Sequence, residues 1–270
     1  MKYWYLMIRA EHLVKKFGDV EAVRDITFQV GEGEIFAFLG PNGAGKTTTI
    51  KMLTTLARPT SGRVEIDGLD PALHQHQVRK RFGIVFQDPS LDDELTAYEN
   101  MDFHGLLYNV PRRSRIEGIA RLLKLFELWD RRDDLVKHFS GGMRRRLEIA
   151  RGMLHTPRIL FLDEPTLGLD PQTRNQLWSH VRKLNEEERV TVFLTTHYME
   201  EADRVAQRIA IIDHGRIVAQ GTPQELKQQT GSETLEQAFL ALTGSTIRDE
   251  EASSVDLMRN FAKMWTRRRR

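Results

Sequence analysis

The sequence of 270 residues contains no cysteine, no large excess of charge of one sign and no long hydrophobic run. The absence of cysteine excludes a disulfide framework, a thiol nucleophile and a metal site with cysteine ligands. The 40 Lys and Arg residues nearly balance 38 Asp and Glu residues, and the net charge of +2 argues against nucleic-acid binding through bulk charge. No apolar run approaches the ~20 residues of a membrane-spanning helix, so we expect any action at a membrane to depend on a partner.

What the sequence does contain is an alternation of two hydrophobic periods. Apolar runs of strand length occur at 35–39, 159–162, 191–194 and 209–212, with segments of helical period between them. Short runs of this kind are typical of parallel strands that are buried on both faces. The alternation predicts an α/β fold with a mostly parallel sheet covered by helices on both sides.

Two regions differ from this alternation. Residues 6–14 and 22–30 have the pattern of strands, and the turn-prone residues 17–19 lie between them. From about 88 to 156, amphipathic segments such as 116–129 dominate. The second region predicts a helical insertion in the α/β body.

The strongest local signal is a glycine-rich segment between a predicted buried strand and a predicted helix over 47–56. It satisfies the pattern G-x-x-x-x-G-K-[ST] and consists of Gly40, Pro41, Asn42, Gly43, Ala44, Gly45, Lys46, Thr47 and Thr48. Glycines let successive N–H groups point at one phosphate, and the helix adds the positive end of its dipole. Lys46 can reach the β- and γ-phosphates, while Thr47 supplies a hydroxyl ligand for Mg²⁺. The alternative is a chance match in a glycine-rich turn.

Two adjacent carboxylates, Asp163 and Glu164, end the apolar run at 159–162. A strand in this place would bring Asp163 beside the phosphate loop, where it can hold Mg²⁺ directly or through water. Because neighbouring residues on a strand point to opposite faces, Glu164 is expected to act instead as the base, or the orienting group, for an attacking water. The alternative for Glu164 is a solvated turn carboxylate before Pro165.

A second predicted anion-binding helix start lies at Ser140, Gly141, Gly142 and Met143. This segment resembles the signature sequence of ABC ATPases, although Phe139 stands where leucine is commoner in that family. The alternative is a simple glycine-containing helix cap. The resemblance implies that two copies of the ATPase domain pack head to tail, as a homodimer, and trap two ATP molecules at their interface.

The remaining motifs of the family follow in order. The resemblance implies that Phe17 stacks on adenine, that Gln87 contacts Mg²⁺ or water, that Asp170 lies in the loop crossing to the other protomer, and that His197 bonds the γ-phosphate. It therefore assigns catalysis to Glu164, His197, Lys46 and Gln87, and the metal to Thr47, Gln87 and Asp163. The alternatives are a core aromatic for Phe17, a surface glutamine for Gln87 and a structural histidine for His197.

The resemblance covers about residues 6–221. It implies a P-loop NTPase (RecA-like) fold, in which a mostly parallel sheet core carries an N-terminal antiparallel β subdomain and an inserted α-helical subdomain at about 88–156. Residues 222–270 are expected to form a C-terminal extension with short helices and a polar tail that ends in Arg267–Arg270.

Two segments, 88–100 and 235–244, are similar to the daunorubicin-resistance type of ATPase. This subgroup energises exporters of drugs and related compounds, and its membrane partner is a separate polypeptide. The similarity implies an ATP-hydrolysing exporter subunit, peripheral on the cytoplasmic side of the membrane, with an integral membrane permease as partner and no nucleic acid. Because the transported compound contacts the permease, residues that select it are not expected in this chain.

Two other functions are possible within the family. A soluble ABC ATPase acting on nucleic acid or ribosomes usually carries two cassettes or long coiled-coil insertions, which this sequence lacks. A nucleotide-gated scaffold without turnover would have lost the base or the switch histidine, yet Glu164 and His197 are both present.

Overall fold

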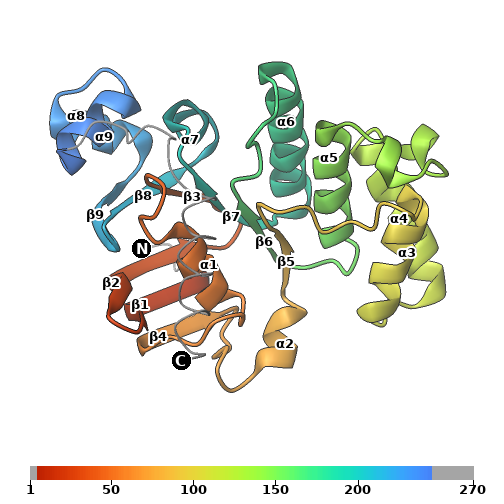
Figure 1. Cartoon of the computed structure of the whole chain (residues 1–270), viewed down its shortest axis with the longest axis horizontal. Helices are drawn as coiled ribbons and strands as arrows, with labels where there is room; N and C mark the ends of the chain where they lie inside the picture. Colours follow the sequence, from red (N-terminus) through yellow and green to blue (C-terminus); the bar gives the residue numbers. More distant parts are fainter. Residues whose placement is uncertain (1–4, 245–270) are drawn as a thin grey trace, which may run out of the picture.

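The computed structural model describes residues 5–244, which form two β-sheets and the helices around them (Figure 1). In chain order the elements are β1 (Leu6–Phe17), β2 (Val20–Gly31), β3 (Ile35–Leu39), α1 (Lys46–Leu53), β4 (Ser61–Ile66), α2 (Gln75–Arg79), β5 (Phe82–Val85), α3 (Ala97–Leu107), α4 (Arg112–Leu125), the 3-10 turns η1 (Trp129–Arg131) and η2 (Val136–His138), α5 (Gly141–Gly152), β6 (Ile159–Asp163), α6 (Pro171–Glu188), β7 (Thr191–Thr196), α7 (Met199–Val205), β8 (Arg208–Asp213), β9 (Arg216–Gly221), α8 (Pro223–Thr230) and α9 (Leu235–Thr243). The predicted tail with Arg267–Arg270 lies outside the described residues.

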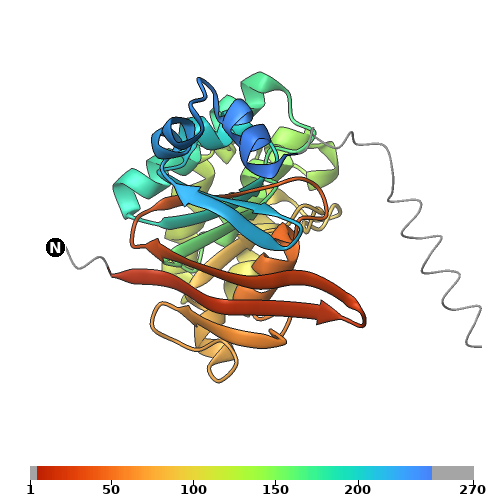
Figure 2. The same cartoon turned by 90° about the vertical axis from the view of Figure 1, so that its left-hand side faces the viewer.

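The larger sheet has the strand order β5-β6-β7-β3-β8-β9. Its strands are parallel except for β9, which runs antiparallel to β8. Every residue of β3 and of β6 is buried, as the continuous apolar runs predict. Strands β2, β1 and β4 form a separate antiparallel sheet, whose strands extend across the view in Figure 2. The predicted α/β fold, with a mostly parallel sheet and an antiparallel N-terminal part, is confirmed.

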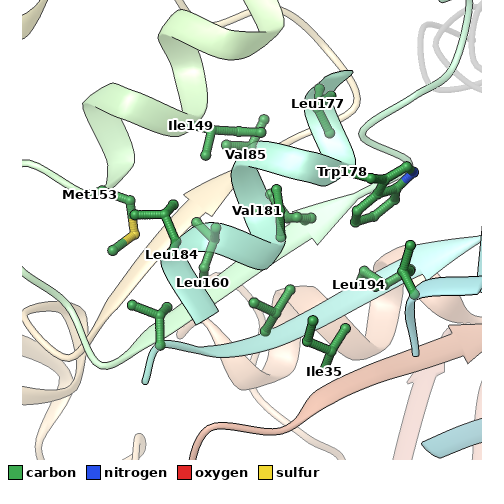
Figure 3. Packing of buried hydrophobic residues seen from close by; sticks show 14 of the residues in the cluster. Ile35, Val85, Ile149, Met153, Leu160, Leu177, Trp178, Val181, Leu184 and Leu194 are labelled. Carbon is green, nitrogen blue, oxygen red and sulfur yellow. The ribbon is translucent and has the colours of Figure 1, made fainter. Parts of the chain in front are cut away.

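One face of the parallel sheet is covered by helices. Figure 3 shows side chains of α5 and α6, among them Ile149 and Val181, packed over sheet residues such as Leu160 and Leu194. Trp178 of α6 is fully buried in the same cluster. Burying a side chain of this size typically contributes ~1.5–3 kcal/mol, so this layer firmly holds the strands whose ends carry the site.

The opposite face packs against the antiparallel sheet and α1. Its alternate side chains are aromatic, as the two-residue period of a strand requires. The ring centroids of Phe36 and Phe38 each lie 5.7 Å from that of Phe193, and Phe28 of β2 lies 5.8 Å from Phe193. This aromatic layer fixes the antiparallel sheet, and with it the end of β1 at Phe17, relative to the parallel strands.

Helices α3, α4 and α5 lie between β5 and β6 in the chain and gather on one side of the molecule (Figure 1). The helix predicted over 116–129 is α4, which begins four residues earlier. Pro111 precedes it with φ −55°, and proline is favoured at a helix start because it lacks an N–H group that would have no partner there. Glu127, with φ 56°, ends the turn after the helix. None of the helices within residues 5–244 has the length and apolar character needed to cross a bilayer.

Candidate nucleotide-binding and hydrolysis site

The phosphate loop joins the end of β3 to the start of α1. Gly45 has φ 109°, a left-handed conformation that favours glycine, and a Cβ there would come within 2.7 Å of the carbonyl oxygen of Ala22. A Cβ on Gly40 would lie 2.3 Å from the carbonyl oxygen of Ile212. No side chain caps the start of α1. Only glycine at positions 40 and 45 therefore lets the loop lie this close to Ala22 and Ile212. Because no side chain caps α1, its first N–H groups remain available to bind an anion.

Lys46 is folded into this loop. Its Nζ donates to the carbonyl oxygens of Gly40 at 2.7 Å and Pro41 at 3.2 Å, and lies 3.0 Å from Oε1 of Glu164. Only 6% of Lys46 is exposed. A buried ammonium needs such partners, and a phosphate group can replace them because it offers the same kind of acceptor.

Asp163, the last residue of β6, is held by two hydroxyl groups. The Oγ1 atoms of Thr195 and Thr47 donate to its Oδ1 at 2.5 Å and 3.3 Å. Burial raises the pKa of Asp163, although both hydroxyl groups oppose the rise. Thr47 and Asp163, two of the three predicted metal ligands, thus lie in contact. Their hard oxygen atoms fit Mg²⁺, which typically takes one or two protein ligands and completes its shell with phosphate and water.

Glu164 lies beyond the end of β6 with φ 50°, so its direction is set by this left-handed conformation and not by the strand pleat on which the prediction relied. Its N–H donates to Oγ1 of Thr195 at 3.1 Å, and its Oε2 lies 2.8 Å from Nδ1 of His197. Burial alone would raise the pKa of Glu164, but the hydrogen bond from His197 and the charge of Lys46 outweigh burial and hold that pKa below its usual value. Glu164 is therefore an ionised acceptor at neutral pH.

Phe17 and Gln87 are exposed and lie apart from these contacts. Phe17 ends β1 with 54% of its surface exposed, and Nζ of Lys15 lies 4.8 Å from its ring centroid. Gln87 is also exposed, two residues beyond β5, where its carbonyl oxygen accepts from Arg145. Within residues 5–244, no hydrogen bond joins the Gln87 side chain to the carboxylates or the phosphate loop.

The predicted signature forms the start of α5, and no hydrogen bond of its Ser140 cap reaches the phosphate loop. Ser140 accepts from the N–H of Met143 at 3.3 Å, and Asp170 caps α6 by accepting from the N–H of Thr173 at 3.0 Å. A Cβ on Gly142 would lie 2.3 Å from Cγ2 of Thr173, so glycine lets these two helix starts approach each other. In the part of the chain that the structure describes, no hydrogen bond or ion pair links the signature to the phosphate loop.

Comparison with known proteins agrees with this geometry. The family model described as ABC transporter matches residues 23–167. The chain belongs to the ABC transporter family. It is 47% identical over 228 residues to the daunorubicin/doxorubicin resistance ATP-binding protein of Streptomyces peucetius, a match covering 84% of this chain and 69% of that protein. It is 40% identical over 220 residues to the Nod factor export ATP-binding protein I of Ralstonia nicotianae, covering 82% and 68%.

Solved structures of ABC proteins share the fold. An ATP-binding subunit of an ABC transporter superposes with a TM-score of 0.79 at 30% identity, covering 88% of this chain and 99% of that one. A dimeric ATP-binding cassette in a post-hydrolysis state, bound to ADP and Pi, gives 0.71 at 29% identity, covering 80% and 98%. The predicted ABC ATPase, a nucleotide-binding enzyme, is thereby confirmed.

The sequence analysis did not identify Thr195, whose hydroxyl holds both Asp163 and Glu164 in place. Its hydroxyl donates to Asp163 and accepts from the N–H of Glu164. The available signal was a pair of hydroxyl residues, Thr195 and Thr196, that follows the apolar run 192–194 at the carboxyl end of β7. Hydroxyl groups buried at such a strand end need partners, and parallel strands end at one edge of the sheet.

Proposed function

We propose that this chain is the ATP-hydrolysing subunit of an exporter and powers transport of a drug-like compound by a separate integral membrane permease. The observation that supports turnover is the contact of Lys46, Glu164 and His197 beside Asp163. The export role is supported by the similarity to an antibiotic-resistance ATP-binding protein and to a Nod factor export ATP-binding protein. The chain then works at the cytoplasmic side of the membrane as a peripheral subunit, with no nucleic acid partner.

ATP binds through groups that the chain already holds in place. Backbone N–H groups between Asn42 and Thr48 bind the β- and γ-phosphates, and Lys46 exchanges its carbonyl partners for phosphate oxygens. Phe17 stacks on adenine with its exposed ring. Thr47 and Asp163 hold Mg²⁺, with Gln87 contacting the metal or a water. When bound, Mg²⁺ neutralises charge on the phosphate oxygens.

Glu164 orients the attacking water and accepts its proton. The lowered pKa keeps the carboxylate ionised, so it can accept a hydrogen bond from water and then a proton as the water oxygen bonds to the γ-phosphorus. The bond from that phosphorus to the leaving ADP oxygen breaks in the same displacement. Lys46 stabilises the charge on the phosphates, and His197 keeps Glu164 in position and bonds the γ-phosphate.

A single chain holds one half of each of two nucleotide sites: its phosphate loop belongs to one site and its signature to the other. Within residues 5–244, no hydrogen bond or ion pair joins the phosphate loop to the neighbouring Asp170 or to the signature, Ser140, Gly141, Gly142 and Met143. We infer that they complete the site of a second copy, so that two chains pack head to tail around two ATP molecules. A dimeric cassette of similar fold supports this arrangement.

The proposal is tested with Glu164→Gln, which keeps the shape of the site but removes the base. We expect ATP affinity to remain while hydrolysis falls by ~10²-fold or more, so that an ATP-bound dimer accumulates in size-exclusion chromatography. A variant that stays monomeric at saturating ATP would contradict the shared site.

The partner is tested by purifying the tagged chain from detergent-solubilised membranes. Recovery of an integral membrane protein supports the exporter. Recovery of ribosomes or DNA instead would show that the chain is a soluble ABC ATPase acting on nucleic acid.

A further inference from the structure

A buried carboxylate on α7 lies four residues after His197 in the chain. Glu201 is only 6% exposed, and its Oε2 accepts from Oγ1 of Thr166 at 2.7 Å. Thr166 is itself fully buried and follows Glu164 by two residues. The hydrogen bond from Thr166 to Glu201, which we call the tether, therefore joins the segment of the proposed base to the helix that follows the switch histidine.

Thr166 belongs to two consecutive turns. In the first, the N–H of Leu167 donates to the carbonyl oxygen of Glu164 at 3.2 Å. In the second, the N–H of Leu169 donates to the carbonyl oxygen of Thr166 at 3.1 Å. The first turn begins at the proposed base, and the second leads to Asp170 at the start of α6. A side chain that holds Thr166 therefore limits where both ends of this segment can lie.

Arg174 of α6 supports the tether from another side. Its Nη1 lies 3.9 Å from Oε1 of Glu201, and its Nε donates to the carbonyl oxygen of Leu169 at 2.8 Å. Its Cζ lies 4.4 Å from the ring centroid of Tyr198, the residue directly after His197. Arg174 and Glu201 thus connect residues 166–169 to residues 198–201 through side-chain contacts.

Two contacts join the same two segments. One is the 2.8 Å contact between Glu164 and His197, whose side chains are also the groups proposed to meet the attacking water and the γ-phosphate. The other is the tether, which is buried and lies between groups that the proposed mechanism does not use. The tether can therefore keep the two backbones at a fixed separation with or without ATP.

We propose that Glu201 is a positioning residue for hydrolysis. Through Thr166 it holds the turn of Glu164 against the helix that follows His197, so that the base and the switch histidine reach the same γ-phosphate. Catalytic groups tolerate little displacement, since a misplacement of ~1 Å can cost ~10²-fold in rate. This role rests on the functions proposed above for Glu164 and His197.

The tether can be removed with little loss of stability. Removing one partner leaves the other buried and unpaired, whereas replacing both by apolar groups of similar shape can be nearly neutral. The informative variant is therefore the full chain with Thr166→Val and Glu201→Met together. We expect its Tm to stay within about 4 °C of the wild-type value. We expect kcat for ATP hydrolysis to fall by about tenfold or more, with the KM for ATP within about twofold, because the phosphate loop is unchanged.

Three single variants serve as controls. Glu201→Gln should keep most of kcat, because the amide oxygen can still accept from Thr166. Glu200→Met changes the exposed neighbour on the same helix and should hydrolyse ATP as the wild-type chain does. Val205→Ala truncates a side chain that is 6% exposed, so it should lower Tm while kcat, measured well below Tm, stays unchanged.

The outcomes separate positioning from folding. A double variant with normal kcat would overturn the positioning role and leave the ATPase standing. A double variant whose kcat falls only together with Tm, as the folded fraction is lost, would show that the tether only stabilises the fold, which also overturns the role.

If the double variant does not fold, Thr166→Val carries the test alone, because it removes only the donor hydroxyl. Its kcat should fall by about tenfold at unchanged KM, and a normal kcat would overturn the role. Normal hydrolysis by Glu164→Gln would overturn the proposed base, and the positioning role with it.

Discussion

The hydroxyl of Thr195 donates to Oδ1 of Asp163 at 2.5 Å and accepts from the N–H of Glu164 at 3.1 Å. One side chain of β7 therefore positions both carboxylates at the end of β6. The pairing of these strands places Thr195 directly opposite Asp163. We expect the geometry of hydrolysis to depend on this hydroxyl, because it holds both carboxylates in place.

Thr195→Val tests this dependence, because it removes the hydroxyl and keeps the shape of the side chain. The loss leaves buried polar groups with fewer partners, so we expect the free energy of unfolding to fall by ~1–3 kcal/mol and kcat to fall by about tenfold. Urea unfolding and steady-state ATPase assays measure the two effects. Thr195→Ser should restore both, and a valine variant with normal kcat would contradict the positioning role.

Asp163→Asn should separate the metal role of this residue from its role in folding. Burial raises the pKa of Asp163 above its value in the unfolded chain, so its ionisation lowers stability at neutral pH and this loss disappears as pH falls through the folded-state pKa. The neutral asparagine should therefore make the nucleotide-free chain more stable at pH 7, as thermal unfolding would show.

The same variant should lose stabilisation by Mg-ATP. A ligand at 100 times its Kd stabilises a protein by ~2.7 kcal/mol, and the wild-type chain should show a gain of this order. In Asp163→Asn the gain should be much smaller, because a carboxylate ligand is missing. An equal gain in both chains would show that Asp163 does not hold the metal.

Phe17→Ala tests the proposed contact with adenine. The ring is 54% exposed, so its removal should change stability little, while loss of a stacked base typically costs ~1–3 kcal/mol. We expect ATP affinity, measured with a fluorescent ATP analogue, to weaken by about tenfold or more. Phe17→Tyr should bind normally. Val20→Ala is the control, because Val20 is 66% exposed on the neighbouring strand and should not affect binding.

Two partly buried histidines, His104 and His155, predict acid sensitivity away from the site. Burial lowers the pKa of His104 from its ordinary value of 6.5 to about 3, helped by the nearby charge of Arg151, and burial lowers that of His155 to about 4. Below pH 6.5 the unfolded chain takes up protons that the folded chain excludes, so stability is full above pH 6.5 and is lost as pH falls toward 4.

His155→Gln measures this contribution. Glutamine can keep the hydrogen bond that His155 makes with the carbonyl oxygen of Phe82, at 3.0 Å, but it does not titrate. Between pH 6.5 and pH 4 the variant should lose less free energy of unfolding than the wild-type chain, by on the order of 1–3 kcal/mol at pH 4. Urea unfolding across this range provides the test, and identical slopes in the two chains would rule out His155 as a source of the acid sensitivity.

Much of the site was predictable because it is local in the chain. The left-handed Gly45, the lysine at the start of α1 and the capping residues Ser140 and Asp170 each act within a few residues of their partners. Apolar runs similarly predicted the buried strands, since both faces of a parallel strand are covered. The start of α4 was misplaced, because Pro111 begins the helix before its apolar period becomes evident.

The sequence by itself therefore determined the phosphate loop, the order of the motifs and the class of fold, because turn conformation, capping and strand periodicity depend on neighbours in the chain. Only the tertiary structure decided that Thr195 orders Asp163 and Glu164, and that Arg145 and Glu148 hold the segment with Gln87. These contacts join residues 31 to 58 positions apart in the chain. Their geometry depends on how the parallel strands pair and how α5 packs over the sheet, which no local pattern specifies.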